Sequence, residues 1–397
     1  MNRDVLTIEK ALEDGKGILR LEPAWVPRSF CIPGKRLKLH PQDYYAYGAD
    51  RGGIDERWFA STVKADNGPR TTEFEGLSFV YAGKSERVLL RDAIELAGAH
   101  ILGPEIMRAH GGWQAFAKFF DNQEPLPHHI HHTDAMAAKI GQKGKPEAYF
   151  FPRQLNDHGG LFPYTFFGLN PGTTREEIKE CLAVWKQRDN TILAFSKAYK
   201  LRLDTGWDVP PGVLHAPGSL LTYEPQRASD VFSMFQNIVW ERYNPIELLQ
   251  KDIPAEKRDD LDFYIDLLDW ELNVDPLFFQ HRFMPPKPLR PRDEMRAEGY
   301  EEYNIVYKSE YFSAKELTVL PGRTVRIADS GPYGAIVIQG HGRIGPLDIE
   351  SPSQIRFGEM TRDEIFVTAE AARAGVTVAN MSQVEDLVML KHFGPPA

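Results

Sequence analysis

The sequence predicts a mainly β protein built from two β-barrels with helical inserts. Short stretches of alternating apolar and polar residues, separated by Gly, Pro, Asn and Asp, recur before residue 243 and again after residue 301. Between them, residues 244–300 change to acidic stretches of helical spacing followed by a proline-rich segment. At 397 residues the chain exceeds what one hydrophobic core usually serves. We therefore expect more than one structural unit.

The first expected unit, residues 1–243, contains several strand patterns. These are rich in β-branched and aromatic residues, and they cover residues 57–63, 77–81, 147–151, 219–223 and 231–235. The strand at 147–151 could pair antiparallel with a histidine-rich strand at 128–132. Residues 104–120 instead predict a helix, on which Phe116, Phe119 and Phe120 have the i, i+3, i+4 spacing of a packed face.

Helical inserts are expected in two places. At about residues 172–200, Thr173 is an acceptable N-cap and Glu176 follows at capping-box spacing, which predicts a pair of helices. Residues 244–300 form a second helical insert with a proline-rich linker. Residues 301–397 then form a degenerate second barrel, for which we expect a structural role because its only histidines are His341 and His392.

Charge and hydropathy exclude several classes of protein. The net charge of −9 offers no basic surface for a nucleic-acid backbone. No apolar run is long enough to cross a membrane, and the first ten residues lack the apolar segment of a secretory signal. Cys31 and Cys181 are too few and too far apart for a disulfide framework. We expect a cytoplasmic protein with no nucleic-acid or membrane partner, and a homodimer is compatible with the sequence.

Four histidines lie within five positions, namely His128, His129, His131 and His132. In a β-strand His129 and His131 point to one face, and the other two point to the opposite face. Glu147 and His215 would complete a set of three histidines and one glutamate, which suits a divalent first-row metal. The alternative is a hydrogen-bonded core cluster, but such a buried cluster is costly without a partner. We expect a metal centre inside the first barrel.

These motifs resemble those of a known family. The matching segments are His129-Ile130-His131, Asp134, Gly144-Lys145-Pro146-Glu147, Gly206 and Pro211-Gly212-Val213-Leu214-His215. They resemble the two signature motifs of the cupin superfamily and, more narrowly, the type I phosphomannose isomerases, which are metal-dependent enzymes with two cupin barrels. Further matches are Glu56-x-Trp58, Asn67-Gly68-Pro69, Gly172-x-Thr174-Arg175-Glu176-Glu177, Glu224, Gln226 and Ser229-Asp230. The resemblance covers residues 15–236 and, more weakly, the C-terminal barrel, and it implies double-stranded β-helix (jelly-roll) barrels.

Three positions depart from the family's pattern. His129 stands where the family usually has glutamine, which gives the more general three-His, one-Glu cupin set, and His132 replaces a proline. Met234 occupies the position of a catalytic arginine in bacterial members. A thioether offers no charged fork for phosphate, whereas a guanidinium does. We therefore predict that the substrate does not require phosphate, although Arg227 or Arg242 could supply a cation from nearby.

Three residues are candidates for catalysis. Lys145 lies two residues before Glu147 on the same strand face, where it would bind a hydroxyl or shuttle a proton, or else be an exposed loop lysine. Glu224 and Asp230 follow the last ligand, and Glu224 could face the cavity.

Four further residues are candidates for substrate binding. Glu56 and Trp58 could line a sugar site, since aromatic faces pack on the apolar faces of sugar rings, although Trp58 suits a core position equally well. Asp134 would bind substrate or cap a helix. Arg227 would supply the nearby cation.

The expected activity is aldose–ketose isomerisation of a carbohydrate substrate, a sugar or sugar derivative, as in mannose-6-phosphate isomerase. One divalent ion, with zinc expected first and Mn, Fe, Co or Ni as alternatives, would act as Lewis acid. Lys145 or Glu224 would carry a proton between C1 and C2. Alternatives are another metal-dependent cupin enzyme, a lyase or a dioxygenase, and a non-catalytic sugar-binding protein. Oxygen consumption with bound iron would indicate a dioxygenase, and sugar binding without turnover would indicate a non-catalytic sugar-binding protein.

Overall fold

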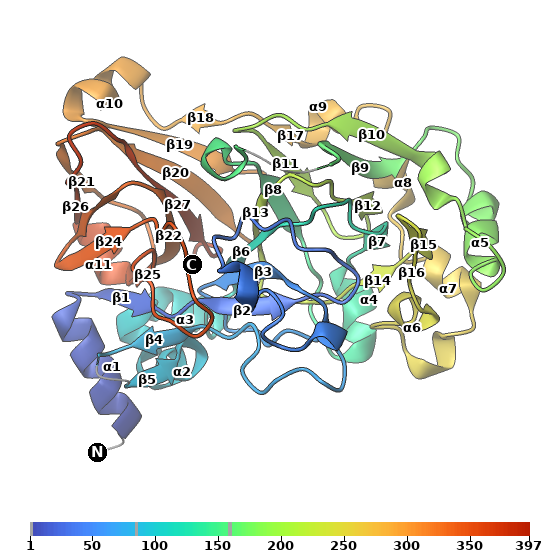
Figure 1. Cartoon of the computed structure of the whole chain (residues 1–397), viewed down its shortest axis with the longest axis horizontal. Helices are drawn as coiled ribbons and strands as arrows, with labels where there is room; N and C mark the ends of the chain where they lie inside the picture. Colours follow the sequence, from blue (N-terminus) through green and yellow to red (C-terminus); the bar gives the residue numbers. More distant parts are fainter. Residues whose placement is uncertain (1–2, 84–85, 158–160) are drawn as a thin grey trace.

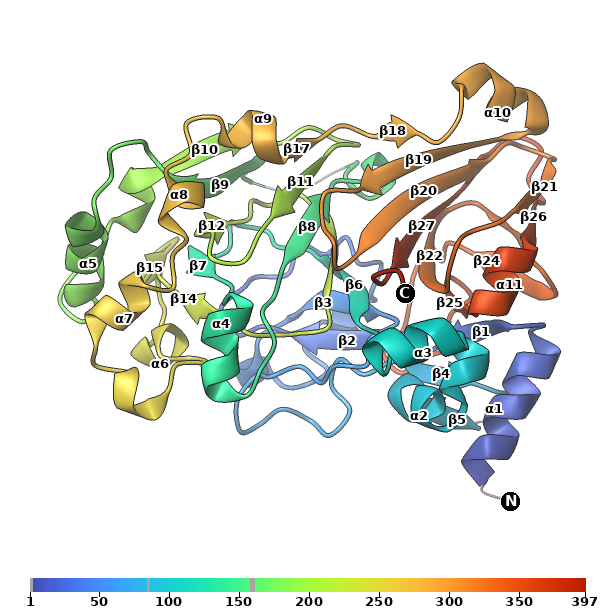
Figure 2. The same ribbon diagram turned by 180° about the vertical axis from the view of Figure 1, so that it is seen from behind.

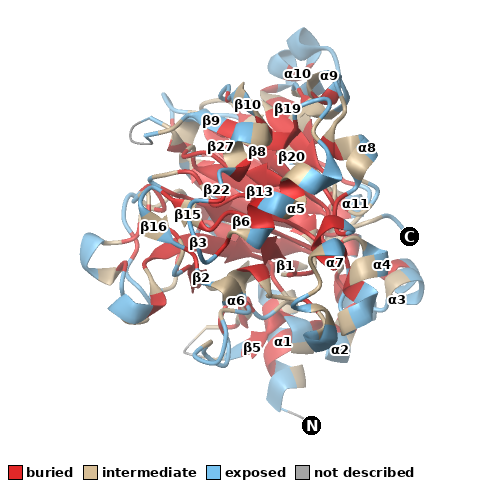
Figure 3. Ribbon diagram, turned by 90° about the vertical axis from the view of Figure 1, so that its right-hand side faces the viewer, coloured by how far each residue is buried: buried red, intermediate tan, exposed pale blue. Residues whose placement is uncertain are grey.

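Two β-barrels lie side by side in the computed structural model, which describes residues 3–83, 86–157 and 161–397 (Figure 1). Each barrel consists of two facing sheets, and every pair of named strands is antiparallel. The strands at the centre of the molecule consist mainly of buried residues, while most helices lie outside and carry exposed residues (Figure 3). Apolar residues of each barrel form a buried core. The predicted mainly β fold with two barrels and helical inserts is confirmed.

The first barrel pairs a seven-stranded sheet with a five-stranded sheet. In spatial order the larger sheet contains β17 (Phe283–Met284), β11 (Gly206–Val209), β8 (Glu147–Phe150), β13 (Thr222–Arg227), β6 (Ala115–Phe120), β3 (Ile54–Phe59) and β2 (Ala24–Pro27). The smaller sheet contains β10 (Ser196–Lys200), β9 (Tyr164–Leu169), β12 (His215–Ala216), β7 (His129–Ile130) and β14 (Ser233–Met234). A short hairpin, β15 (Ile238–Val239) with β16 (Arg242–Tyr243), follows the smaller sheet.

The second barrel pairs a nine-stranded sheet with a four-stranded sheet. The larger contains β18 (Lys287–Pro288), β19 (Tyr300–Val306), β20 (Ser313–Val319), β27 (Leu387–Phe393), β22 (Tyr333–Gln339), β25 (Glu364–Val367), β1 (Ile18–Leu21), β4 (Phe79–Tyr81) and β5 (Arg87–Leu89). The smaller contains β21 (Thr324–Ile327), β26 (Val376–Asn380), β23 (His341–Ile344) and β24 (Leu347–Glu350). Strand β1 pairs with β25, so the hydrogen-bonded sheets cross the expected boundary between residues 1–243 and 301–397. That division of the chain stays a prediction.

Helices cover the ends and outer faces of the barrels. The α-helices are α1 (Arg3–Asp14), α2 (Leu90–Ile101), α3 (Pro104–His110), α4 (Asp134–Ala137), α5 (Arg175–Ala183), α6 (Ile246–Leu249), α7 (Leu261–Ile265), α8 (Trp270–Asn273), α9 (Phe278–Arg282), α10 (Arg292–Glu298) and α11 (Ala369–Ala374). Short 3-10 turns cover Pro41–Asp43, Ala49–Arg51, Ala138–Ile140, Arg153–Leu155, Ile192–Phe195 and Ala255–Lys257. Helices α1, α2 and α3 gather beside the second barrel, whereas α5 to α8 lie at the far end of the first (Figure 2). No helix among the described residues is long and apolar enough to span a membrane.

The expected helix at residues 104–120 is wrong over its second half. Helix α3 ends at His110, where Gly111 adopts a left-handed conformation, and β6 begins at Ala115. All of β6 is buried because it is sandwiched between the two barrels. A strand buried on both faces shows little polar alternation, so its apolar pattern is easily taken for a helix. Phe116 and Phe120 therefore face the inside of the first barrel, and Phe119 packs toward the second.

Two further sequence predictions need correction. Strand β8 pairs with β11 and β13, and β7 pairs with β12 and β14, so these two strands lie in opposite sheets and do not pair. In the insert at 172–200, only α5 is an α-helix, and the chain then passes through a 3-10 turn into β10. The capping box is present one residue later than expected, between Thr174 and Glu177.

Candidate metal centre

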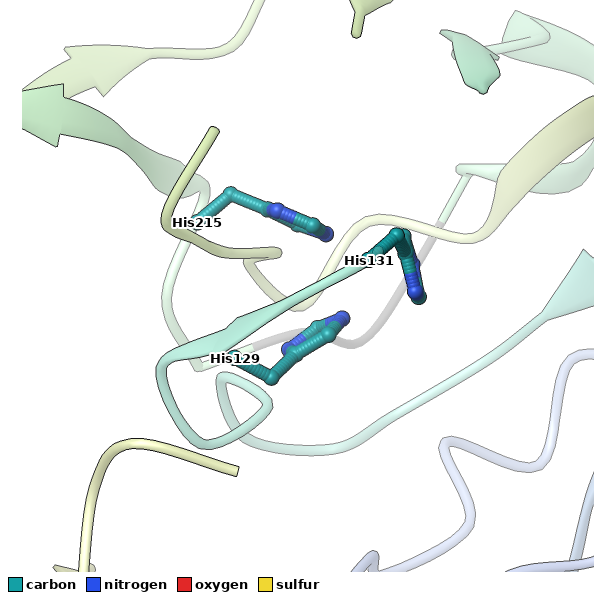
Figure 4. A group of neighbouring side chains, drawn as sticks. All are labelled: His129, His131 and His215. Atoms are coloured by element: carbon teal, nitrogen blue, oxygen red, sulfur yellow. The ribbon is translucent and has the colours of Figure 1, made fainter. Parts of the chain in front are cut away.

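Three histidines converge inside the first barrel. His129 lies on β7, His131 follows two residues later, and His215 lies on β12, directly opposite His129 in the sheet register. All three side chains are buried, and one ring nitrogen of each lies within 4.8 Å of those of the other two. The three imidazole rings gather around one point between the strands (Figure 4).

Backbone carbonyls fix the orientation of all three rings. The Nδ1 atoms of His129, His131 and His215 each lie 2.8 Å from a carbonyl oxygen, of Pro127, Val231 and Val213 respectively. A carbonyl only accepts, so each Nδ1 carries the proton and each Nε2 offers its lone pair. Burial lowers the pKa of His129 and lowers that of His131 to about 3, so both rings are neutral at physiological pH. Neutral imidazoles oriented in this way are suited to bind a metal ion.

Glu147 reaches the same point from the facing sheet. Its Oε2 lies 2.9 Å from His131 Nε2, and its Oε1 lies 3.2 Å from His215 Nε2. Tyr149, two residues further along β8, donates a hydrogen bond of 2.5 Å to Glu147 Oε1. The buried His215 Nε2 makes no hydrogen bond within the described residues. Three imidazoles, one carboxylate and a buried ring nitrogen without a hydrogen bond match the donor set of a divalent metal such as zinc.

The remaining histidines of the cluster face away from this point. His128 Nε2 lies 3.2 Å from Ser196 Oγ, and His132 Nε2 lies 3.0 Å from Ser233 Oγ. Both rings are buried, which lowers the pKa of His128 to about 3 and that of His132 to about 4. The alternation expected of a strand thus places His129 and His131 on one side and His128 and His132 on the other, in different surroundings.

A small cavity of about 40 Å³ opens beside the converging histidines. Its polar lining combines three cations with four carboxylates, namely Arg28, Lys118, Lys145, Glu56, Glu147, Glu224 and Asp230. Its apolar lining includes Phe30, Leu126, Pro217, Phe232 and Met234. The cavity therefore has a charged interior beside an apolar wall.

The charged groups form a continuous chain of ion pairs. Lys145 Nζ lies 2.8 Å from Glu147 and 3.5 Å from Glu224, and Lys118 Nζ lies 3.3 Å from the same Glu224 oxygen. Lys118 also contacts Glu56 at 3.2 Å. Arg28 closes the chain, since its guanidinium lies 3.2 Å from Glu56 and 3.0 Å from Asp230. Every cation of the cavity lining is thus already paired with a carboxylate.

The carboxyl groups that line the cavity differ in pKa. Burial and the neighbouring Glu147 raise the pKa of Glu224 to about 8, although Lys118 and Lys145 oppose the shift. Burial also disfavours ionised Asp230, but Arg28 together with Lys145, Lys251 and Lys118 outweighs burial and lowers the pKa of Asp230 to about 2. Two carboxyl groups on one cavity wall therefore differ widely in proton affinity, a difference typical of functional sites.

The other residues predicted to bind substrate differ in how deeply they are buried. Trp58 is fully buried against Phe116, and its Nε1 donates to Glu56 Oε2 at 2.8 Å, so it supports the cavity from behind. Asp134 and Arg227 pair with each other at 2.6 Å on the outside of the barrel. The N-cap of α4 is Thr133, with Asp134 in the first helical turn.

Neither arginine considered near Met234 lines the cavity. Arg227 stacks over Tyr311 at 4.7 Å, and Arg242 pairs with Glu124 at 2.9 Å. The guanidinium that lines the cavity beside Met234 belongs to Arg28.

Comparison with solved structures identifies the fold. Mannose 6-phosphate isomerase from Bacillus subtilis superposes with a TM-score of 0.62 at 16% identity, over 95% of this chain and 99% of that chain. A protein from Archaeoglobus fulgidus proposed to be a mannosephosphate isomerase gives 0.63 at 14% identity, over 96% and 98%. A zinc-bound mannose 6-phosphate isomerase gives 0.62 at 12% identity, over 96% and 100%. The chain has the two-barrel cupin fold of the mannose-6-phosphate isomerases. No protein-family model matches the sequence, and no curated protein is significantly similar to it.

Three residues of the site in this mannose-6-phosphate isomerase fold were not among the candidates predicted from the sequence, namely Arg28, Lys118 and Tyr149. Lys118 was hidden because β6 resembles a helix, yet a single lysine in the run Ala115–Phe120 is a signal of a buried charge. Tyr149 shares a strand face with Glu147, so strand alternation alone would have found it. Arg28 lies just after β2, and no local pattern places it beside Asp230, which is 202 positions away.

Proposed function

We propose that the chain is a metal-dependent aldose–ketose isomerase that acts on a sugar or sugar derivative. The observation that carries this proposal is the convergence of His129, His131, His215 and Glu147 beside a cavity lined by alternating lysines and carboxylates. A bound divalent ion would supply Lewis acidity toward a carbonyl and its adjacent hydroxyl. The surrounding groups would move the proton and orient the sugar.

Glu224 is the proposed base. Its raised pKa of about 8 lies close enough to neutral pH for the group both to accept and to release a proton. Its carboxylate lies on β13, in the sheet facing the histidines, and it lines the cavity. Lys145 sits between Glu147 and Glu224 as a paired ammonium, which has no lone pair with which to accept a proton. Lys145 would instead stabilise negative charge that develops on the sugar oxygen. Arg28 and Lys118 hold Glu56 and Glu224 in place through ion pairs.

The proposed substrate carries no phosphate. A phosphate group brings about −1.5 to −2 units of charge at neutral pH. The cavity lining has three cations, each within 3.5 Å of a carboxylate, and Met234 adds no charge. A phosphate would have to displace a carboxylate from one of these buried pairs, which is costly. Neutral hydroxyl groups can share the existing donors and acceptors without breaking a pair.

A substrate panel tests the proposal. Zinc-reconstituted protein would be incubated with free and phosphorylated aldoses and ketoses, and exchange of the C2 proton with solvent would be followed. We expect exchange with at least one free sugar. Efficient turnover of mannose 6-phosphate with all free sugars inert would contradict the claim about phosphate. Oxygen uptake by the iron form would favour a dioxygenase, and sugar binding without exchange would favour a sugar-binding protein.

A further inference from the structure

A second, much larger cavity adjoins the small cavity beside the converging histidines. It has a volume of about 650 Å³ and shares two walls, Phe30 and Phe232, with the inner cavity of about 40 Å³. On this measure a single water needs about 10–15 Å³, so the inner cavity has room for about three waters. Small-molecule sites typically occupy about 300–1,000 Å³. The inner cavity therefore fits only the reacting end of a sugar, whereas the outer cavity fits a whole ring.

The two shared aromatic residues form an ordered wall. Their ring centroids lie 5.9 Å apart in an edge-to-face arrangement. The backbone N–H of Phe232 donates to Asp252 at 3.0 Å, and Lys251 Nζ lies 5.0 Å above the Phe232 ring. Lys251 covers one face of the buried Phe232, so the half-buried Phe30 is the ring that offers a surface to the apolar face of a ligand ring.

A hydrogen-bond network links the two cavities behind this wall. Arg28, which lines the inner cavity, donates to Asn67 Oδ1 at 2.9 Å, and Asn67 lines the outer cavity. Asp230 of the inner cavity accepts a hydrogen bond of 3.1 Å from the backbone of Asp66, another outer residue. One loop, residues 66–69, therefore contributes to the outer cavity while holding two charged residues of the inner one.

The charges of the outer cavity are largely balanced. Lys251 Nζ lies 2.5 Å from Asp66 and 3.5 Å from Asp252, so its charge is neutralised. The other charged lining residues are Glu247 and Arg258, both exposed. A cavity lined by polar and apolar residues, with two phenylalanines and no excess cation, suits an uncharged, hydroxyl-rich ligand better than an anion.

We infer that the outer cavity is a second sugar subsite. The substrate would then be an uncharged reducing saccharide of at least two rings, with its reducing end at the metal centre and the next ring against Phe30 and Phe232. This inference rests on the proposed isomerase function, whose substrate it specifies. It assigns a role to residues 66–69 and 245–253, which the reaction itself does not use.

Binding measurements test this subsite independently of turnover. Zinc-loaded protein would be titrated calorimetrically with hexoses, with reducing hexose disaccharides of several linkages and with hexose 6-phosphates. We expect at least one disaccharide to bind about ten-fold or more tightly than its constituent hexose, equivalent to about 1.4 kcal/mol. Gln142→Trp, which places a bulky ring in the outer cavity, should reduce this preference to less than about two-fold. The matched control Gln187→Trp changes an exposed residue elsewhere and should retain the preference.

The outcomes separate the two proposals. Disaccharide binding without C2 proton exchange would support the subsite and contradict the isomerase. Hexose exchange with no preference for any disaccharide would support the isomerase and overturn the subsite. Tighter binding of a hexose 6-phosphate than of every disaccharide would also overturn it, as would an unchanged preference in Gln142→Trp. Ser29→Trp, at another exposed position of the same lining, repeats the test if Gln142→Trp fails to fold.

Discussion

Tyr149 Oη donates a 2.5 Å hydrogen bond to Glu147 Oε1, the carboxylate that faces His131 and His215. Both residues lie on β8 and point to the same side, and both are buried. The phenol therefore fixes the rotamer of a proposed metal ligand. Partners of this kind orient ligands and typically change metal affinity when they are removed.

Tyr149→Phe should weaken zinc binding by about 10- to 100-fold while leaving the fold intact, because it removes only the hydrogen bond to Glu147. Competition with a chromophoric chelator measures the affinity. Tyr199→Phe is the matched control, since this tyrosine packs against the same aromatic cluster. Equal zinc affinity in Tyr149→Phe and the native protein would exclude an orienting role.

His131→Ala and Glu147→Gln should each lose bound metal, because each removes one donor of the converging set. Metal content of purified protein, measured by mass spectrometry, reports the result. His132→Gln is the control, since its ring faces Ser233 on the other side of the strand. Full metal stoichiometry in both ligand variants would disprove the metal centre.

Glu224→Gln should slow C2 proton exchange by about 10²- to 10⁴-fold, because an amide of the same size cannot accept the proton. Its metal content should stay that of the native protein, since Glu224 is not one of the converging donors. Lys145→Met provides the comparison. If exchange is lost in Lys145→Met but retained in Glu224→Gln, the proton is carried by the lysine.

The Arg57 pair with Asp363 should stabilise the contact between the two barrels. The two terminal nitrogens of Arg57 each lie 2.8 Å from an oxygen of the Asp363 carboxylate, and all of these groups are buried. Arg57→Met would leave a buried carboxylate unpaired, so the free energy of unfolding should fall by about 3–5 kcal/mol. Urea denaturation checks this value. The exposed pair of Arg91 with Asp92 is the control, and Arg91→Met should cost less than about 1 kcal/mol.

His392 should make the protein sensitive to acid. Burial lowers its pKa to about 3, below the unfolded value of 6.5, so the folded state binds fewer protons between these pH values. Stability is therefore lost as the pH falls below about 6.5. His392→Gln should reduce the slope of unfolding free energy between pH 4 and 6 by about 1.4 kcal/mol per pH unit. Metal-free proteins should be compared, and identical slopes would refute the assignment.

The convergence of the proposed metal ligands could be predicted from sequence because strand periodicity and a short motif determine which face each side chain occupies. His129 and His131 are two residues apart, so any strand places them together. The ion pairs that line the cavity depend instead on which strands pair across long distances in the sequence. Glu224 meets Lys118 because β13 pairs with β6, and that register follows from the barrel as a whole. The helical appearance of residues 115–120 hid this pairing, since a strand buried on both faces lacks polar alternation.

The outer cavity could not be predicted from the sequence, for a related reason. Phe30 and Phe232 are separated by about half the chain, and neither belongs to a motif. Two isolated phenylalanines are far more often core residues than the walls of a binding site. Only the three-dimensional arrangement shows that they stand between a small charged cavity and a large one.

Strand β1 is hydrogen-bonded between β25 and β4 in the larger sheet of the second barrel. The ribosome synthesises β25 almost 350 residues after β1, so β1 has no β25 to pair with during most of translation. The sheet can therefore form completely only near the end of translation. Until then, β1 and the β4–β5 hairpin present unpaired edges that invite association with other chains. Loss of β1 from the finished protein would uncover the edge of β25, so an N-terminal truncation should promote aggregation of the opposite half of the molecule.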